Sequence, residues 1–369
     1  MKPATRAVQP RQVHLDQVPI APPIHPAASY EADPEQLTAI LDAAERGFAY
    51  GRYGNPTAAT AEAAIADLEG AKDAVWCATG TGAMLATLVA GCRAGDEVLC
   101  ANEIYGGTRA LLERVVSRWG ITVRFAPHRE LAAGPATRVI LVETIANPAL
   151  EVPDLAAIAS RKGDAWLVVD NTFATPILCQ PLRHGADVVV HSATKYLGGH
   201  GDVVAGVVAG GRAVIGQIRD VAVTLGVTGD PWGAWLVLRG IKTLPLRMER
   251  HVHNAGLVAS FLRARGLVVR QAMTASWLSA PGGILAVDLP DRAAALTALR
   301  RVKLFRVATS LGDCHSMVLH PASTSHRGLD ATALAAAGVT PGTVRLSVGI
   351  EDVDDLIADL AHAFGVPGP

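Results

Sequence analysis

Cysteine is scarce in this chain and is never arranged in close pairs. The 369 residues include five cysteines, an odd number, and no CxxC motif. A disulfide framework and a zinc ribbon both need paired or closely spaced cysteines, so the sequence predicts neither, and we predict no metal site. Scattered free cysteines favour a reducing compartment, and we expect the protein in the cytoplasm.

The chain also lacks an excess of charge of either sign. Lysine and arginine number 33 and the acidic residues 34, which gives a net charge of -1. A protein that binds nucleic acid or anionic lipid through its field carries a positive excess, so we expect neither partner. Residues 1–20 contain no apolar signal-peptide core, and no later apolar run reaches about 18 residues. We therefore expect neither secretion nor a membrane span.

A large apolar fraction in a long chain is what the sequence does contain. Half of the residues are hydrophobic and 18% are charged, which is typical of a well-packed globular protein. A chain of 369 residues exceeds what one core usually holds and favours two domains. We expect a proline-rich N-terminal arm over residues 1–48, an α/β domain over residues 49–238, and a smaller α+β domain over residues 239–369 that begins with a long connecting helix.

Short apolar runs alternate with alanine-rich helical segments from about residue 61 to residue 210. This alternation is typical of a mostly parallel sheet covered by helices. The predicted strands of that sheet span residues 74–77, 97–101, 121–125, 138–142, 165–170, 188–191 and 205–208. Elsewhere we predict helices over residues 34–46, 233–265 with a kink at Pro245, 292–301 and 352–364, and strands over residues 283–288 and 343–348.

The predicted strand at residues 188–191 leads directly into Ser192, Thr194 and Lys195, and then into glycines. Ligands of α/β proteins bind at the carboxyl ends of strands. An isolated lysine is usually an ordinary exposed residue. Here two hydroxyl groups suited to a phosphate accompany it, and this favours a ligand site.

The predicted strand at residues 165–170 ends in Asp170 after a run that should be buried. A buried carboxylate is costly unless it is paired, although capping of the next turn is an alternative. Pyridoxal phosphate needs such a carboxylate, because it keeps the pyridine nitrogen protonated and strengthens the ring as an electron sink. Asp170 and Lys195 follow successive strands, so the pair is more persuasive than either residue alone.

A glycine-rich turn at residues 78–82 connects one strand to a helix predicted over residues 83–92. Free amides at such a helix start, with Gly80 and Thr81, can hold a phosphate. A dinucleotide fingerprint is the competing interpretation, but it needs glycine where the chain has Leu85, and no suitable acid ends the next strand. A turn without any ligand is the other alternative.

Three further segments offer candidate contacts. The loop over residues 50–57 presents Tyr50 and Arg52, whose guanidinium could clamp a phosphate. Tyr105 follows a predicted strand and offers an aromatic face, and Arg345, in a C-terminal strand, could bind the carboxylate of an amino acid. Each of these residues alone is more often structural.

Together the segments resemble the cystathionine γ-synthase and γ-lyase family, the pyridoxal-phosphate enzymes of cysteine and methionine metabolism. The resemblance extends from about Tyr50 to the C-terminus, through YGRYGNPT, LEGAK, ATGTG, AGDEV, YGGT, ETIANP, VVDNTFATP, HSATKYLGGHGD, LRGIKTL, SLGD, HPAS and RLSVGIED. It implies a fold type I architecture, with a large domain built on a mostly parallel sheet and a smaller α+β C-terminal domain.

The resemblance also implies how pyridoxal 5'-phosphate is held. Lys195 would bind it as a Schiff base, Asp170 would pair with the ring nitrogen, and Tyr105 would stack on the ring and assist proton transfer. The family's usual assembly is a homotetramer in which a neighbouring subunit completes each phosphate site. The residues implied to contact the phosphate are Gly80, Thr81, Ser192 and Thr194, with Tyr50 and Arg52 from the neighbour.

For the substrate, the resemblance implies γ-elimination or γ-replacement on a sulfur amino acid or an O-acylhomoserine. Asn147 would lie near the ring's 3-oxygen, and Arg345 with Ser310 would bind the substrate carboxylate. His315 stands where γ-lyases and γ-synthases typically carry glutamate and sulfhydrylase-like members often carry a basic residue. It is therefore a candidate substrate contact or a neutral change at the pocket edge.

Two other interpretations of the function stay open. One is an O-acylhomoserine sulfhydrylase or a specialised biosynthetic enzyme that forms C–S or C–C bonds. The other is a catalytically silent regulatory protein that binds pyridoxal phosphate. The segment between residues 265 and 283 is shorter than the family pattern, and this change could reshape access of the substrate.

Overall fold

The computed structural model describes residues 2–8, 19–42, 44–45 and 47–368. Within these residues a first sheet has the strand order β1-β7-β6-β5-β4-β2-β3. Its strands are β1 (Asp73–Cys77), β2 (Glu97–Ala101), β3 (Thr122–Ala126), β4 (Thr137–Glu143), β5 (Trp166–Asp170), β6 (Val188–His191) and β7 (Gly206–Gly210). The strands from β6 to β3 run parallel, and β7 is antiparallel to both of its neighbours. The predicted mostly parallel sheet is confirmed.

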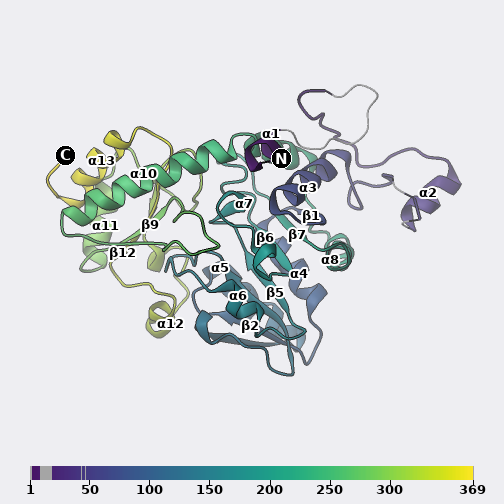
Figure 1. Ribbon diagram of the computed structural model, residues 1–369, viewed down its shortest axis with the longest axis horizontal. Helices are drawn as coiled ribbons and strands as arrows, with labels where there is room; N and C mark the ends of the chain where they lie inside the picture. Colours follow the sequence, from purple (N-terminus) through teal and green to yellow (C-terminus); the bar gives the residue numbers. More distant parts are fainter. Residues whose placement is uncertain (1, 9–18, 43, 46, 369) are drawn as a thin grey trace.

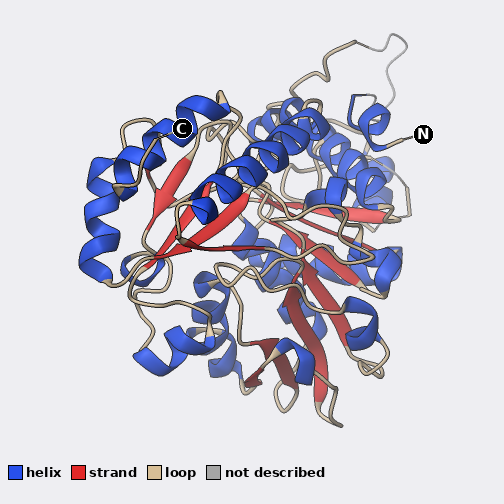
Figure 2. Ribbon diagram, turned by 60° about the vertical axis from the view of Figure 1, so that its left-hand side comes forward, coloured by secondary structure: helices blue, strands red, loops and turns tan. Residues whose placement is uncertain are grey.

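Helices cover both faces of the first sheet (Figure 2). They are α3 (Pro56–Glu69), α4 (Gly80–Gly91), α5 (Gly106–Arg114), α6 (Leu155–Ala159), α7 (Thr175–Leu178), α8 (Arg212–Leu225) and α9 (Pro231–Ile241). In β4, Val139 and Leu141 pack into the core formed with α4, α5 and α8, whereas Ile140 and Val142 pack into the core formed with α3, α7 and α9. Burial on both faces explains the nearly continuous apolar sequence of the central strands.

A second sheet, with the strand order β10-β11-β12-β9-β8 among the described residues, belongs to the C-terminal part of the chain. Its strands are β8 (Val268–Gln271), β9 (Ile284–Asp288), β10 (Arg306–Val307), β11 (Met317–Leu319) and β12 (Thr343–Ser347), accompanied by α10 (Leu244–Ala264), α11 (Arg292–Arg301), α12 (Ala331–Ala336) and α13 (Val353–Phe364). Val258, Leu285, Leu346 and Leu360 share one buried core. Figure 1 shows α10 running from the first sheet's helices to α13. The predicted α+β character of this region is confirmed.

The structure corrects the helix predicted over residues 233–265. This segment forms two helices, α9 and α10, because Lys242 and Thr243 separate them. Pro245 lies in the first turn of α10, where its missing N–H costs nothing, and proline disfavours a helical residue before it. No residue range was predicted for ten further strands and α-helices of the described residues: β8, β10, β11, α1 (Pro3–Val8), α3, α5, α6, α7, α8 and α12. Among the described helices, none is both long and apolar enough to cross a membrane.

The N-terminal segment carries two short helices, α1 (Pro3–Val8) and α2 (Pro34–Leu41). The oxygen Oδ1 of Asp33 accepts a hydrogen bond from the Gln36 amide at 2.8 Å and starts α2. The helix predicted over residues 34–46 ends at Leu41 instead, and residues 43 and 46 lie outside the described residues. Figure 1 shows α2 at the opposite end of the molecule from α13. The domain boundaries at residues 48 and 238 stay predictions, and the second falls inside α9.

Candidate active site

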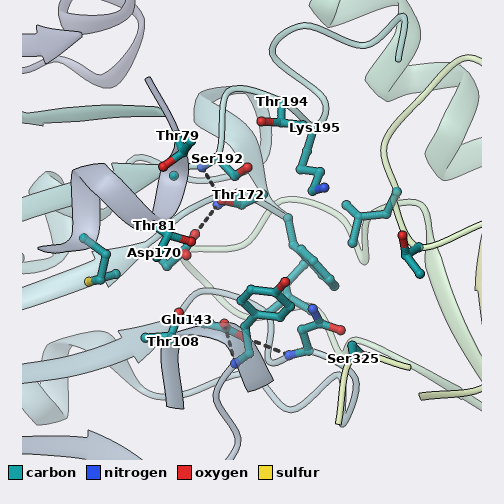
Figure 3. Close-up of a pocket in the computed structure, with 18 of the residues that line it drawn as sticks. Thr79, Thr81, Thr108, Glu143, Asp170, Thr172, Ser192, Thr194, Lys195 and Ser325 are labelled. Carbon is teal, nitrogen blue, oxygen red and sulfur yellow. Dashed lines mark hydrogen bonds between the residues drawn. The ribbon is translucent and has the colours of Figure 1, made fainter. Parts of the chain in front are cut away.

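A cavity of about 620 Å³ opens at the carboxyl ends of β4, β5 and β6. Nine residues predicted from the sequence line it: Gly80, Thr81, Tyr105, Asn147, Asp170, Ser192, Thr194, Lys195 and Arg345. Because parallel strands place their carboxyl ends at one edge, residues far apart in the sequence meet here. Figure 3 shows Lys195 pointing into the cavity, with Asp170 on one side and Ser325 on the far side.

Lys195 is held in the cavity by a residue of the C-terminal region. Its Nζ lies 3.0 Å from Oγ of Ser310. Burial, with the nearby positive charge of Arg345, lowers the pKa of Lys195 from its ordinary value to about 8. A larger fraction of this amine is therefore neutral near pH 7 than of an exposed lysine, and only the neutral amine is a nucleophile.

This pKa sets an expected pH dependence for cofactor uptake. Below the pKa of an amine its neutral fraction rises about tenfold per pH unit, and above it the fraction is constant. We expect the apoenzyme to take up pyridoxal phosphate faster as the pH rises from 7 towards 8, with little further gain above about 9. Stopped-flow absorbance at several pH values measures this rate. A rate that keeps rising tenfold per unit to pH 10 would show an unperturbed lysine instead.

Asp170 ends β5 and faces the cavity. Its Oδ1 accepts a hydrogen bond from the Thr172 amide at 2.9 Å, and Oγ1 of Thr172 accepts one from the Ser192 amide, also at 2.9 Å. Burial raises the pKa of Asp170, although the hydrogen bonds with Thr172 and the nearby His191 oppose that rise. A carboxylate held this way gains from a cation in the cavity, and the protonated ring nitrogen of pyridoxal phosphate fits that requirement.

A second carboxylate, Glu143, lies beside Asp170 because β4 and β5 pair in this register. Its two oxygens accept hydrogen bonds from the backbone amides of Tyr105 at 2.9 Å and Asn147 at 2.8 Å. Burial and the charge of Asp170 raise the pKa of Glu143 well above its usual range. Glu143 thus fixes the backbone at two predicted site residues, Tyr105 and Asn147.

The end of the cavity that fits a phosphate lies at the start of α4. Oγ1 of Thr79 accepts a hydrogen bond from the Gly82 amide at 2.8 Å and begins the helix, so the preceding amides have no partner within α4. A Cβ on Gly80 would lie 2.8 Å from Cβ of Ser192, so only glycine leaves this cradle open. Helix amides with the hydroxyl groups of Thr81 and Ser192 fit a phosphate.

Arg345 is buried in β12 of the second sheet and bonds to Asn147, which follows β4 of the first sheet. Its Nη1 donates to Oδ1 of Asn147 at 3.0 Å, and its Nη2 donates to the carbonyl oxygen of Ser310 at 2.9 Å. Burial lowers the pKa of Arg345 to about 10, and the guanidinium is still charged at neutral pH. A fixed, buried guanidinium of this kind suits a carboxylate.

Four predicted site residues are not among those that line the cavity. One of them, Ser310, still contacts two of the lining side chains. Tyr50 and Arg52 are exposed, and Nη1 of Arg52 donates to the carbonyl oxygen of Val223 at 2.9 Å. The His315 side chain is 53% exposed, and its Nδ1 lies 3.0 Å from Oδ1 of Asp313, which also accepts the His315 amide. This local turn directs the imidazole away, so the geometry of one chain gives no support to substrate binding by His315.

Other residues that line the cavity were not predicted from the sequence. They include Thr79, Thr108, Glu143, Thr172, Ser325 and Arg327. Glu143 ends a buried strand just as Asp170 does, so the same argument could have found it. Ser325 and Arg327 belong to an irregular segment that no strand or helix pattern places. In the described part of the chain, no group of His, Cys, Asp or Glu side chains could hold a metal ion.

Comparisons with known proteins agree with this geometry. Residues 4–365 match the family model described as Cys/Met metabolism PLP-dependent enzyme. The chain is 40% identical to the L-methionine gamma-lyase of Pseudomonas putida over 94% of this chain and 92% of that protein. It is 39% identical to the O-succinylhomoserine sulfhydrylase of Pseudomonas aeruginosa over 86% of this chain and 84% of that protein.

A solved structure supports both the fold and the cofactor. It is a putative O-acetylhomoserine (thiol)-lyase from Campylobacter jejuni, 30% identical, with a TM-score of 0.95 over 99% of this chain and 100% of that one. That crystal structure contains a lysine joined to pyridoxal monophosphate. The fold is therefore that of the fold type I enzymes, as predicted. The chain belongs to the Cys/Met metabolism family of pyridoxal-phosphate-dependent enzymes, and its cofactor is pyridoxal 5'-phosphate.

Proposed function

We propose that the protein catalyses γ-elimination or γ-replacement on a sulfur amino acid or an O-acylhomoserine. The observation that carries this proposal is the arrangement of Lys195, Asp170 and Arg345 around one cavity. It supplies a base of lowered pKa, a partner for the ring nitrogen and a site for the carboxylate of an amino acid. The relatives named above act on substrates of this class, as their names state.

The cofactor, when bound, withdraws electrons from the substrate's Cα and stores the charge that proton loss leaves. Asp170 would keep the ring nitrogen protonated, and Asn147 would lie near the ring's 3-oxygen. The phosphate would be held by Gly80, Thr81, Ser192 and Thr194. The hydroxyl of Thr194 donates to the Ala205 carbonyl oxygen at 3.1 Å, and it would turn from that bond to donate to the phosphate.

Lys195 would hold the cofactor and then move the proton at Cα of the substrate. A base with a pKa of about 8 is well matched to that step near neutral pH. Arg345, aligned by Asn147 and by the Ser310 carbonyl, would bind the substrate carboxylate and so fix Cα near Nζ of Lys195. Tyr105, whose backbone is held by Glu143, would stack on the ring and assist proton transfer at the leaving group.

We also propose a homotetramer with shared active sites. Tyr50 is 45% exposed, and Arg52 lies beside it and over the ring of Tyr53, outside the cavity of its own chain. Neither side chain lines the cavity of its own chain, so both would complete the phosphate site of a neighbouring subunit, with Arg52 exchanging its bond to the Val223 carbonyl oxygen for the phosphate. The cytoplasm is the proposed location, because all five cysteines are free thiols.

Steady-state assays test the proposed reaction. We expect the holoenzyme to release a 2-oxo acid from L-cystathionine, L-methionine or an O-acylhomoserine, or to replace the γ-substituent when sulfide is added. Elimination without sulfide identifies a lyase, whereas product formation only with sulfide identifies a sulfhydrylase. Cofactor binding without turnover of any of these substrates would support a silent regulatory protein and overturn the proposal.

A further inference from the structure

The cavity extends beyond the residues that the proposed function uses. One end is built by the start of α4 and the residues that follow β6. The other end is built by Thr309, Thr324, Ser325 and Arg327, from the C-terminal region. Figure 3 shows Ser325 across the cavity from Thr81 and Asp170. Space and polar groups therefore remain for a part of the substrate that lies away from the reacting carbons.

Arg327 is the charged residue of this cavity that has no role so far. The acidic and basic side chains that line it are Glu143, Asp170, Lys195, Arg327 and Arg345. Glu143 accepts hydrogen bonds from backbone amides, and the proposed function pairs Asp170 with the ring nitrogen. It also gives Lys195 the cofactor and Arg345 the α-carboxylate. In the part of the chain that the structure describes, Arg327 forms no ion pair, and its Nη1 donates only to the Thr324 carbonyl oxygen, at 3.0 Å. Its other N–H groups are free to bind an anion.

The segment that carries Arg327 is anchored beside Tyr105. His326, the preceding residue, is buried, and its amide donates to the Pro321 carbonyl oxygen at 3.0 Å. Nδ1 of His326 lies 2.9 Å from Oγ of Ser325. The Ser325 carbonyl oxygen lies so close to Gly106 that a Cβ at that position would clash with it. Arg327 is thus held on the Tyr105 side, where the proposed function places the leaving group.

We propose that Arg327 binds a second carboxylate, carried at the far end of the substrate's γ-substituent. This inference rests on the proposed function and narrows its substrate class. A guanidinium with free N–H groups pairs with a carboxylate in a bidentate manner. The hydroxyl of Thr309 adds a polar group at this end of the cavity, whereas that of Thr324 already donates to the His320 carbonyl oxygen at 2.8 Å. Half-esters such as O-succinylhomoserine and thioethers such as cystathionine have this carboxylate, whereas O-acetylhomoserine and methionine lack it.

Matched substrates with the R327Q variant test the inference. We measure KM and kcat for O-succinyl-L-homoserine against O-acetyl-L-homoserine, and for L-cystathionine against L-methionine. A charge-assisted hydrogen bond at a partly exposed site corresponds to roughly a tenfold change in affinity. R327Q should therefore raise the ratio of the succinyl to the acetyl KM about tenfold, with the change in KM rather than kcat. If the succinyl-to-acetyl KM ratio changes more, the second carboxylate is that of a half-ester. If the cystathionine-to-methionine KM ratio changes more, it is that of a thioether.

Two further variants separate recognition from general damage. R327K keeps the charge and should restore part of the preference, and R292Q removes an exposed arginine outside the cavity and should leave the ratios unchanged. Equal changes for the substrates with and without the second carboxylate, or unchanged ratios, overturn the inference while the proposed function stands. If the wild-type holoenzyme turns over none of the four substrates, the proposed function fails and this inference fails with it.

Discussion

Lys195→Ala is expected to lower kcat/KM by at least about 10³-fold, because the proposed function gives this one residue both the covalent hold on the cofactor and the role of base at Cα. The visible absorbance band that depends on a lysine bound to the cofactor should disappear as well. Removing the amine also leaves Oγ of Ser310 without the partner it has at 3.0 Å, but this contact costs only about 1 kcal/mol. The variant should therefore fold, and its loss of activity reports chemistry.

Lys303→Ala is the matched control for that experiment. Lys303 is exposed and lies outside the cavity, so both the absorbance band and kcat/KM should stay close to those of the wild type. Absorbance spectra and steady-state rates of the three proteins are compared after reconstitution with pyridoxal phosphate. A wild-type-like band in Lys195→Ala would assign the cofactor to another amine and overturn the proposed roles of Lys195.

Several site residues could be predicted from the sequence because short-range patterns carry them. Asp170 ends one apolar strand and Lys195 follows another, and strand ends in a parallel sheet meet at one edge. Gly80 begins a helix directly after a strand. These features depend on neighbours in the chain, and the resemblance to a known family then supplied the order of the motifs.

Other features could not be predicted because they depend on contacts between distant segments. Arg327 lines the cavity next to a contact between the Ser325 carbonyl and Gly106, which are more than 200 residues apart in the sequence. The local turn at Asp313 directs His315 to solvent, although its position in the motif suggested a substrate contact. The break at Lys242 and Thr243 was missed because apolar periodicity continues across it.

Glu69 belongs to a buried polar network that the sequence pattern did not indicate. This residue ends α3, and its Oε1 lies 2.6 Å from Nε2 of His191 and accepts a hydrogen bond from Nδ2 of Asn171 at 2.8 Å. The Glu69 and His191 side chains are 0% and 1% exposed. A carboxylate in such a place depends on its partners, because burial without them would be very costly.

Glu69→Ala is expected to lower the free energy of unfolding by about 3–5 kcal/mol, because it leaves His191 buried without its partner. The isosteric Glu69→Gln keeps an acceptor oxygen and should cost less. Glu113→Ala breaks the 2.9 Å pair with Arg109, in which the glutamate side chain is 43% exposed, and should cost less than about 1 kcal/mol. Guanidinium unfolding of the holoenzymes at one chain concentration measures all three.

The same network connects stability to the cofactor site. His191 precedes Ser192, and Asn171 follows Asp170. Through its bonds to these two neighbours, Glu69 holds the carboxyl ends of β5 and β6 in place. Glu69→Ala should therefore also release pyridoxal phosphate faster in dialysis than Glu113→Ala does. If Glu69→Ala and Glu113→Ala lose equal stability and release cofactor at equal rates, the network is not a support of the active site.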